Sequence, residues 1–340
     1  MKKYILLFIL LLCISLSGPA AGEQRVIGVL TYLNLSEEEY AEYVLARIRV
    51  IDLLTADGYL QAVSSGLKAN PAEDGIRVVF YESLGEMLMD LEAGKIDAFE
   101  VPQSTADYLC SRNPSMYQPY RFDKSYQNRF EAIITERMSD GFAFMLMEYN
   151  RGLRDQFNTV IREMKEDGTI EKLIRDHIES MVNGEKAPSV IPEQKEGRET
   201  LTIAITGSMP PMDYVGPDGN FSGFNAAILA EIGRRLDKNM ELLQVDSIGR
   251  AMALASGTVD AAFWTRGTPN PQISEMSDEE YAAMVEEYKA VYSEDENEVM
   301  RTLSEALSRI KLDRRDLPDG TISTDPYFLD ISVPVARRQN

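Results

Sequence analysis

Short apolar runs alternate along the first half of the chain with longer segments whose apolar residues recur at helical spacing. The apolar runs predict strands at residues 25–33, 76–81, 96–101 and 129–136. Ser36 and Glu39 form a capping box that predicts a helix start, Ser83 caps a second helix over 83–95, and Pro114 ends a third. This alternation of strands and helices predicts a parallel or mixed sheet covered by helices.

The second half repeats this alternation after a different beginning. Two amphipathic helices, over 141–168 and 169–182, are predicted to meet at the sequence Asp-Gly-Thr, and the non-periodic segment 183–199 reads as a linker. Helices are then predicted over 224–238 and over 247–258, the latter with Ser247 as its N-cap. The predicted strands of this half lie at 201–206, 240–245, 259–265 and 326–338.

One pattern occurs in both halves. The string "LEAGKIDAFEV" at 91–101 resembles "LASGTVDAAFW" at 254–264, and "SLGEML" and "SIGRAM" precede them. Each copy predicts the end of a helix, a glycine in the left-handed C-cap conformation, and a strand that begins with an acid and small residues. Two such α/β units in one chain predict two lobes with a ligand cleft between them.

The first residues predict an exported protein. "MKK" is a basic start, "YILLFILLLCISL" is an apolar run, and "SGPAAG" suits cleavage after Ala21 or Gly22, so residues 1–22 read as a signal peptide. The alternatives are a membrane anchor, for which the run is short, and a lipoprotein attached at Cys13, which lacks the usual small residues before it. We therefore expect a periplasmic or secreted protein.

Composition narrows the function classes. The chain has 340 residues, 44% of them hydrophobic, and a net charge of −20, so its surface disfavours nucleic acid and anionic membranes. Cys110 would remain alone after cleavage, and we expect it to be buried and not disulfide-bonded. The chain has one histidine, His177, which we expect on the surface, and no nucleophile–base pair or metal cluster emerges from the pattern. We therefore expect no enzyme activity, cofactor or metal.

Several segments together resemble one family. "LTIAITGSMPPMDYVGPDGNFSGFNAAILAEIGRRL", "ALASGTVDAAF" and "STDPYFLDISVPVAR" look like the first lobe of extracellular solute-binding proteins of family 3. "VVFYESLGEMLMDLEAGKIDAFEVPQSTADYLCSRNP" looks like the second lobe, and "MKEDGTIEKLIRDHI" like the helical end of these proteins. The resemblance implies a two-lobed, periplasmic-binding-protein-like (type II) α/β fold with a hinge and a central cleft.

The order of these segments departs from that of the family. Elements of lobe two and the terminal helices come first, and lobe one comes last, which predicts a circular permutation. The predicted domains are a lobe-two-like domain at 23–132, C-terminal-type helices at 133–182, the linker 183–199, and a lobe-one-like domain at 200–340 with an acidic helical insertion at about 272–316. Two tandem incomplete modules, or a domain-swapped dimer, are the alternatives to a permuted monomer.

The family resemblance also implies where a ligand would bind. Family members hold amino acids through backbone N–H groups, an arginine on the carboxylate and an acid on the ammonium group. At the matching positions this chain mostly has other residue types; Gln272, for example, stands at the arginine position and Arg266 lies nearby. The candidate ligand contacts are Thr31, Asn34, Glu100, Gln103, Thr206, Met209, Met212, Tyr214, Ser247, Trp264, Thr265, Arg266 and Thr268.

The resemblance therefore predicts a binding protein that captures a small polar solute, amino-acid-like or related, and delivers it to a membrane ABC permease or receptor. A ligand-sensing or interaction module without transport is the first alternative. A dehydratase-like enzyme on the same fold is the second.

Overall fold

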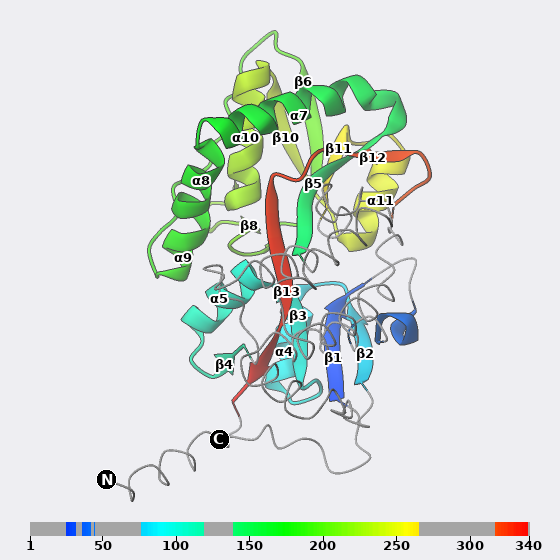
Figure 1. Cartoon of the computed structure of the whole chain (residues 1–340), viewed down its shortest axis with the longest axis vertical. Coiled ribbons are helices and arrows are strands. Elements are labelled where there is room, and N and C mark those ends of the chain that lie inside the picture. Colours follow the sequence, from blue (N-terminus) through cyan, green and yellow to red (C-terminus); the bar gives the residue numbers. More distant parts are fainter. Residues whose placement is uncertain are drawn as a thin grey trace, which may run out of the picture.

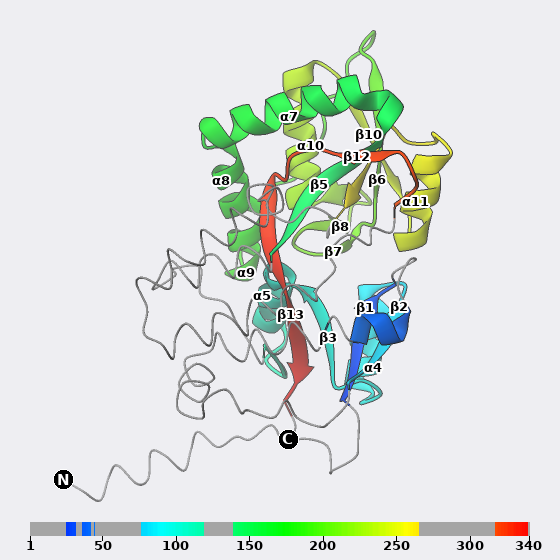
Figure 2. The same cartoon turned by 45° about the vertical axis from the view of Figure 1, so that its right-hand side comes forward.

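The computed structural model describes residues 25–31, 36–41, 44, 76–118, 139–264 and 317–338. These residues form two α/β lobes, one above the other in Figure 1. The turned view in Figure 2 shows the same separation. The predicted two-lobed α/β class is thus confirmed.

The described part of the lower lobe consists of residues 25–31, 36–41, 44 and 76–118 and the end of the last strand. Its parallel strands are β1 (Arg25–Leu30), β2 (Ile76–Tyr81) and β3 (Ala98–Pro102), with β1 between the other two. The remaining elements are helices α4 (Leu84–Glu92) and α5 (Gln103–Arg112) and the short strand β4 (Met116–Tyr117). The capping box between Ser36 and Glu39 is present, because each backbone N–H donates to the other side chain at 3.2 and 3.0 Å.

The upper lobe is built from residues 139–264 and 317–331. Its sheet has the order β10 (Asn239–Gln244), β6 (Thr200–Ile205), β11 (Ala261–Trp264) and β5 (Ser139–Met147), and β12 (Thr321–Ser323) also pairs with β5. A small sheet of β7 (Ser208–Met209), β8 (Asp213–Val215) and β9 (Phe221–Ser222) follows β6. The helices of this lobe are α10 (Phe224–Leu236), α11 (Ser247–Ala255), and a run that contains a 3₁₀ turn η1 (Glu148–Asn150), α7 (Arg151–Glu166), α8 (Thr169–Ile174), a π-helical turn η2 (Arg175–Glu179) and α9 (Ser180–Val182).

The strand β13 (Phe328–Arg337) belongs to both lobes (Figure 1). Residues 328–331 pair antiparallel with β5, and residues 332–336 pair antiparallel with β3. At the crossing, Asp330 and Asp140 are opposite each other, both are buried, and the Ser332 hydroxyl donates to Asp140 at 3.0 Å. A continuous strand of this kind is a place about which two lobes can hinge.

The core of the upper lobe lies between its sheet and the helices α7 and α10. Phe144, Phe157, Phe224 and Tyr327 are at most 2% exposed, and their rings meet at centroid distances of 5.2–6.0 Å. Aromatic side chains of this size supply much of the apolar area that a domain buries. Residues 151–182 are therefore packed against residues 200–264, although a segment without helix or strand separates them.

That separating segment, residues 183–199, is fastened to the lobe. Asn239 at the start of β10 accepts from the Lys195 backbone N–H at 2.9 Å and donates to the Lys195 carbonyl at 3.0 Å. Val190 is 7% exposed and packs on Ala226 and Ala227 of α10.

The two copies of the repeated string have the same backbone geometry. Gly94 and Gly257 both have φ of +70°. Asp97 accepts from the Val26 backbone N–H at 2.8 Å, and its own N–H donates to the Val26 carbonyl at 2.8 Å. Asp260 makes the same two contacts with Thr202, each at 2.8 Å. The acid of each copy thus binds the first residues of the central parallel strand of its lobe.

Two predicted elements are wrong. Residues 141–147 were predicted as the start of a helix but belong to β5, because this continuous apolar run is covered on both faces and pairs with β11, β12 and β13. The N-cap of α11 is Asp246 and not Ser247, since the Asp246 carboxylate accepts from the Gly249 N–H at 2.5 Å. The predicted signal peptide, the strand at 129–136 and the acidic insertion lie outside the described residues.

Two other expectations concern single residues. His177 was expected on the surface and is 4% exposed, so that prediction is wrong. Cys110 is only partly buried and is a free thiol, whose pKa is raised by burial. Among the described helices, none has the length and apolar character needed to cross a bilayer.

Candidate functional site

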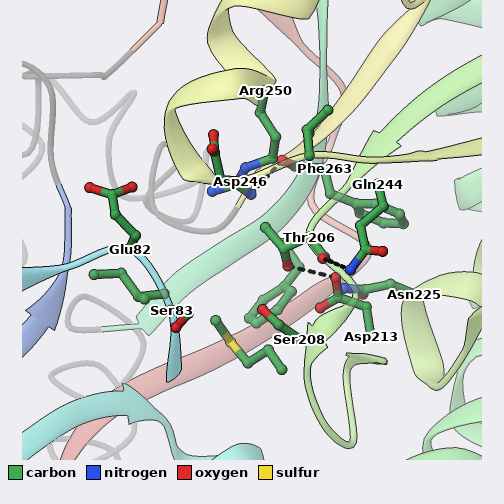
Figure 3. Close-up of a pocket in the computed structure, with 14 residues that line it drawn as sticks. Glu82, Ser83, Thr206, Ser208, Asp213, Asn225, Gln244, Asp246, Arg250 and Phe263 are labelled. Atoms are coloured by element: carbon green, nitrogen blue, oxygen red, sulfur yellow. Dashed lines mark hydrogen bonds between the residues drawn. The ribbon is translucent and has the colours of Figure 1, made fainter. Parts of the chain in front are cut away.

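A cavity of about 440 Å³ lies between the two lobes. It stands at the carboxyl ends of the parallel strands β1 and β2 below and β6, β10 and β11 above, the usual place of a ligand site in open α/β sheets. The lining residues come from both lobes, as Figure 3 shows. They are Leu30, Glu82 and Ser83 from the lower lobe and Phe142, Thr206, Ser208, Met209, Asp213, Asn225, Gln244, Val245, Asp246, Arg250 and Phe263 from the upper lobe.

The upper wall is shaped by the turn that follows β6. Asp213, 5% exposed, accepts from the Thr206 hydroxyl at 2.8 Å and from the Gly207 N–H at 2.9 Å, so its carboxylate joins the two ends of the turn (Figure 3). Burial raises the pKa of Asp213, and the hydrogen bonds from Gly207 and Thr206 oppose that shift. Gln244 donates to the Thr206 carbonyl at 3.1 Å and fixes the neighbouring strand end.

Asn225 presents an amide to the same wall from the first turn of α10. Its side chain is 3% exposed, and its Oδ1 accepts from the Tyr327 hydroxyl at 2.8 Å. Because Oδ1 is held in this way, the Nδ2 donors are directed away from Tyr327. Burial raises the pKa of Tyr327 well above its ordinary value, so the phenol stays a donor.

Arg250 supplies the positive charge of the described lining. It extends from α11, and its Nη1 donates to the Phe263 carbonyl at 2.9 Å at the end of β11 (Figure 3). A guanidinium has five N–H donors in a planar fork, a geometry that matches a carboxylate.

The lower wall presents a carboxylate to the cavity, opposite the upper lobe. Glu82 is exposed at the end of β2 and accepts from the Thr31 hydroxyl at 2.6 Å. Ser83 follows it and caps α4 by accepting from the Glu86 N–H at 3.3 Å. Three carboxylates (Glu82, Asp213 and Asp246) and one guanidinium therefore line the described part of the cavity, which gives a polar site of mixed charge.

The structure brings only some of the predicted contacts to this cavity. Thr206 and Met209 line it; Thr31 does not, although its hydroxyl donates to Glu82, which does. Met212 is fully buried in the core of the upper lobe, and Tyr214 is half-buried on β8; neither is among the lining residues.

The other predicted contacts fall into two groups. Glu100 and Gln103 are buried where β3 meets α5, and the described lining does not include them. Thr265, Arg266, Thr268 and Asn34 lie outside the described residues, as do the side chains of Ser247 and Trp264.

Sequence reasoning missed Glu82, Asp213, Gln244, Asp246 and Arg250. The signal that could have found Glu82 and Asp246 is their position directly after predicted parallel strands, and Gln244 lies at the end of one of these strands. Arg250 follows one helical turn after Asp246 and is therefore directed to the same edge. In the part of the chain that is described, no three His, Cys, Asp or Glu residues are grouped so that they could hold a metal ion.

The fold is a two-lobed α/β architecture (Figure 1) with a cavity between the lobes. Residues 201–315 match the model of the bacterial extracellular solute-binding proteins, family 3, which confirms the family resemblance for this segment; its described part, 201–264, lies in the upper lobe. A search of curated protein sequences finds no match.

Solved structures show low similarity to the chain. The ligand-binding component of an ABC-type import system from Staphylococcus aureus, with zinc bound, is 9% identical with a TM-score of 0.36. The match covers 93% of this chain and 66% of that one. The GluR0 ligand-binding core from Nostoc punctiforme with L-glutamate is 8% identical with a TM-score of 0.33, at 93% and 85% coverage. The periplasmic VFT2 domain of BvgS from Bordetella pertussis is 9% identical with a TM-score of 0.36, at 92% and 80% coverage. Similarities this low say nothing about the solute.

Proposed function

We propose that the chain is an exported solute-binding protein that closes its two lobes on a small polar solute and delivers it to a membrane ABC permease. The observation that carries this proposal is the cavity of about 440 Å³, which is lined by side chains of both lobes. The family match of residues 201–315 supports it.

Closure follows from the geometry of the cleft. A solute that contacts Glu82 below and Arg250 above binds the closed arrangement better than the open one, so it shifts the equilibrium toward closure. Rotation about β13, which passes from one lobe to the other, would permit this movement. The closed surface is then available for recognition by a permease.

The lining favours an amino-acid-like solute. Carboxylates suit an ammonium group, and the guanidinium of Arg250 suits a carboxylate through paired hydrogen bonds. Thr206, Ser208 and Gln244 add neutral polar groups. The circular permutation of the family order belongs to this proposal, since it explains how lobe-two-like elements precede the matched segment in one cleft-forming chain.

A thermal-shift screen tests the proposal with amino acids, amines, carboxylates and sugars. Ser208→Trp fills the cleft from an exposed position on β7, and Ser111→Trp, on an exposed position of α5 outside the lining, is its matched control. A cleft solute raises the melting temperature of the wild type and of Ser111→Trp but not of Ser208→Trp. An equal shift in both variants contradicts binding in the cleft.

Uptake separates transport from sensing. Cells that lack the chain should take up the identified solute more slowly than cells that produce it. Unchanged uptake would favour the ligand-sensing module, and turnover of the solute by the purified protein would favour an enzyme.

A further inference from the structure

A second cavity, of about 710 Å³, lies on the upper lobe and shares no lining residue with the cleft. It is an open groove between the π-helical turn η2, helix α10 and the fastened segment 183–199. Its lining consists of Leu173, His177, Ser189, Val190, Ile191, Glu193, Lys195, Arg198, Ala227, Ala230, Glu231 and Arg234. We call this the η2 groove.

His177 is the unusual residue of the η2 groove. It is 4% exposed, and its Nδ1 atom has no hydrogen-bond partner among the described residues. Buried polar atoms are almost always paired, so such an atom needs an explanation. Burial lowers the pKa of His177, an effect that Lys172 reinforces and Asp176 opposes, so the ring is neutral at pH 7.

The backbone that carries His177 is also unusual. Residues 175–179 form a π-helical turn between α8 and α9. π turns insert an extra residue into a helix, are rare, and occur frequently at functional sites. The unpaired atom and the π turn are two independent observations at one position.

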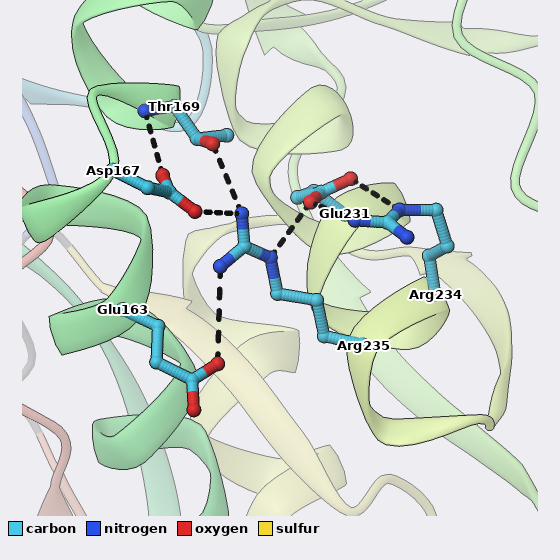
Figure 4. A network of polar contacts seen from close by, with 6 residues as sticks. All are labelled: Glu163, Asp167, Thr169, Glu231, Arg234 and Arg235. Atoms are coloured by element: carbon cyan, nitrogen blue, oxygen red, sulfur yellow. Dashed lines mark hydrogen bonds and ion pairs between the residues drawn. The ribbon is translucent and has the colours of Figure 1, made fainter.

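The rim of the η2 groove carries cations on a chain of net charge −20. The side chains of Lys195 and Arg234 are 52% and 60% exposed, and each contacts a nearby glutamate: Lys195 contacts Glu193 at 3.0 Å, and Arg234 contacts Glu231 at 2.6 Å (Figure 4). The Lys195–Glu193 pair has both partners about half exposed and is therefore weak, so Lys195 can turn to another anion at little cost.

The floor of the η2 groove is apolar. Leu173, Ala227 and Ala230 lie there beside Val190, and Ile191 next to it is 79% exposed. An apolar floor, exposed cations at the rim and a neutral imidazole whose Nδ1 has no partner among the described residues complement one kind of molecule, which has an apolar body and an anionic head.

We propose that the η2 groove binds a small amphipathic carboxylate. The apolar body lies on Leu173, Val190 and Ala230, and the carboxylate lies between Lys195 and Arg234. A polar atom of the ligand that faces His177 supplies the missing partner of its Nδ1 atom.

The single histidine makes the test direct, because its imidazole gives one set of NMR signals. The full chain, labelled at histidine and without an affinity tag, is titrated with hexanoate, hexan-1-ol and hexylamine. Hexanoate is expected to shift the His177 signals to saturation. Hexan-1-ol should bind at least about tenfold more weakly, and hexylamine should cause no saturable shift, since the charge-assisted contacts are lost.

Matched variants locate the binding. Lys195→Gln and Arg234→Gln should each weaken hexanoate binding by about tenfold. Lys95→Gln and Arg151→Gln are the controls, because these cations have similar exposure, 67% and 54%, and similar ion pairs elsewhere. The controls should leave the affinity unchanged, as should Ser208→Trp in the cleft.

Three results would overturn the proposal. They are the absence of a hexanoate shift, a shift that grows linearly without saturation, and a saturable shift that the rim variants do not weaken. Each can occur whether or not the cleft binds a solute, so the test is independent of the proposed function.

Discussion

Arg235 of α10 is the residue at which the helices of residues 151–182 are tied to the lobe formed by residues 200–264. Its guanidinium donates to Glu231 at 2.7 Å, to Asp167 at 2.7 Å and to the Thr169 hydroxyl at 2.9 Å (Figure 4). Asp167 and Thr169 stand at the joint between α7 and α8, so Arg235→Ala should loosen this joint.

The magnitude follows from burial. The side chain of Arg235 is 14% exposed, and a hydrogen bond to a charged group contributes about 1.5–3 kcal/mol when it is protected from water. Because Asp167 is 48% exposed, its bond counts for less than the upper value. We expect Arg235→Ala to lower the free energy of unfolding by about 2–3 kcal/mol.

Arg234 provides the control within the same helix. It binds the same Glu231 with two bonds of 2.8 and 2.6 Å, but its side chain is 60% exposed. Arg234→Ala should therefore cost less than about 1 kcal/mol. Urea unfolding, followed by circular dichroism, measures both variants. Equal losses in the two variants would refute the reasoning that burial, and not the number of bonds, sets the contribution.

Further predictions concern single positions. Gly94→Ala should destabilise the protein by about 1 kcal/mol, because Gly94 has a φ of +70° and open space around it. Gly223→Ala should cost about 3 kcal/mol or more, since a Cβ there would lie 2.7 Å from two backbone oxygens. Urea unfolding compares the two variants. Asp260→Ala should lower the free energy of unfolding by about 1.5 kcal/mol. Asp97→Ala should lower it by less, because the contact of Asp97 with Val26 is exposed; equal losses would contradict this. Burial lowers the pKa of His177, so the unfolded chain takes up its proton first and stability should fall as the pH drops below about 6.5. An NMR titration with a midpoint at or above that of an exposed histidine would contradict the last prediction.

The sequence predicts most of the fold because its periodicity is strong where elements are half-buried. The limits of β2 agree with the predicted 76–81, and those of β6 and β10 differ from the prediction by one residue. The prediction failed at β5, where apolar residues cover both faces and no period distinguishes a strand from a helix. Pairing with strands that are distant in sequence decides that segment, and a local pattern does not contain this information.

His177 shows a missed signal of another kind. Ile170, Leu173 and Ile174 precede it at helical spacing, which places it on the buried face, although its polar character suggested the surface. Pattern and residue type disagreed there, and the structure follows the pattern. The unpaired Nδ1 atom and the π turn could not be predicted, because a local pattern does not contain the packing of η2 against α10.

The candidate site could be predicted less well than the fold, because the predicted contacts were transferred from family positions. The repeat gives a more direct path to the cleft. Glu82 and Ser83 precede "LGEML" in the lower lobe as Asp246 and Ser247 precede "IGRAM" in the upper lobe. Both turns follow a parallel strand and start a helix, and Glu82, Ser83 and Asp246 line one cavity.

Equivalent positions of the two units therefore face one cavity across the lobe boundary. The acid of each string, Asp97 or Asp260, binds the central strand of its lobe, and the strand–helix turn of each unit lies at the edge that faces the other lobe. Arg250 offsets part of the negative charge of the upper wall, but Glu82 and Asp246 still stand in opposite walls, so closure favours a further positive group between them. The solute that closes this cleft should therefore carry an ammonium or another cationic group toward Glu82 and Asp246. Among the amino acids and amines of the thermal-shift screen, we expect those with such a group to raise the melting temperature more than their N-acetylated forms.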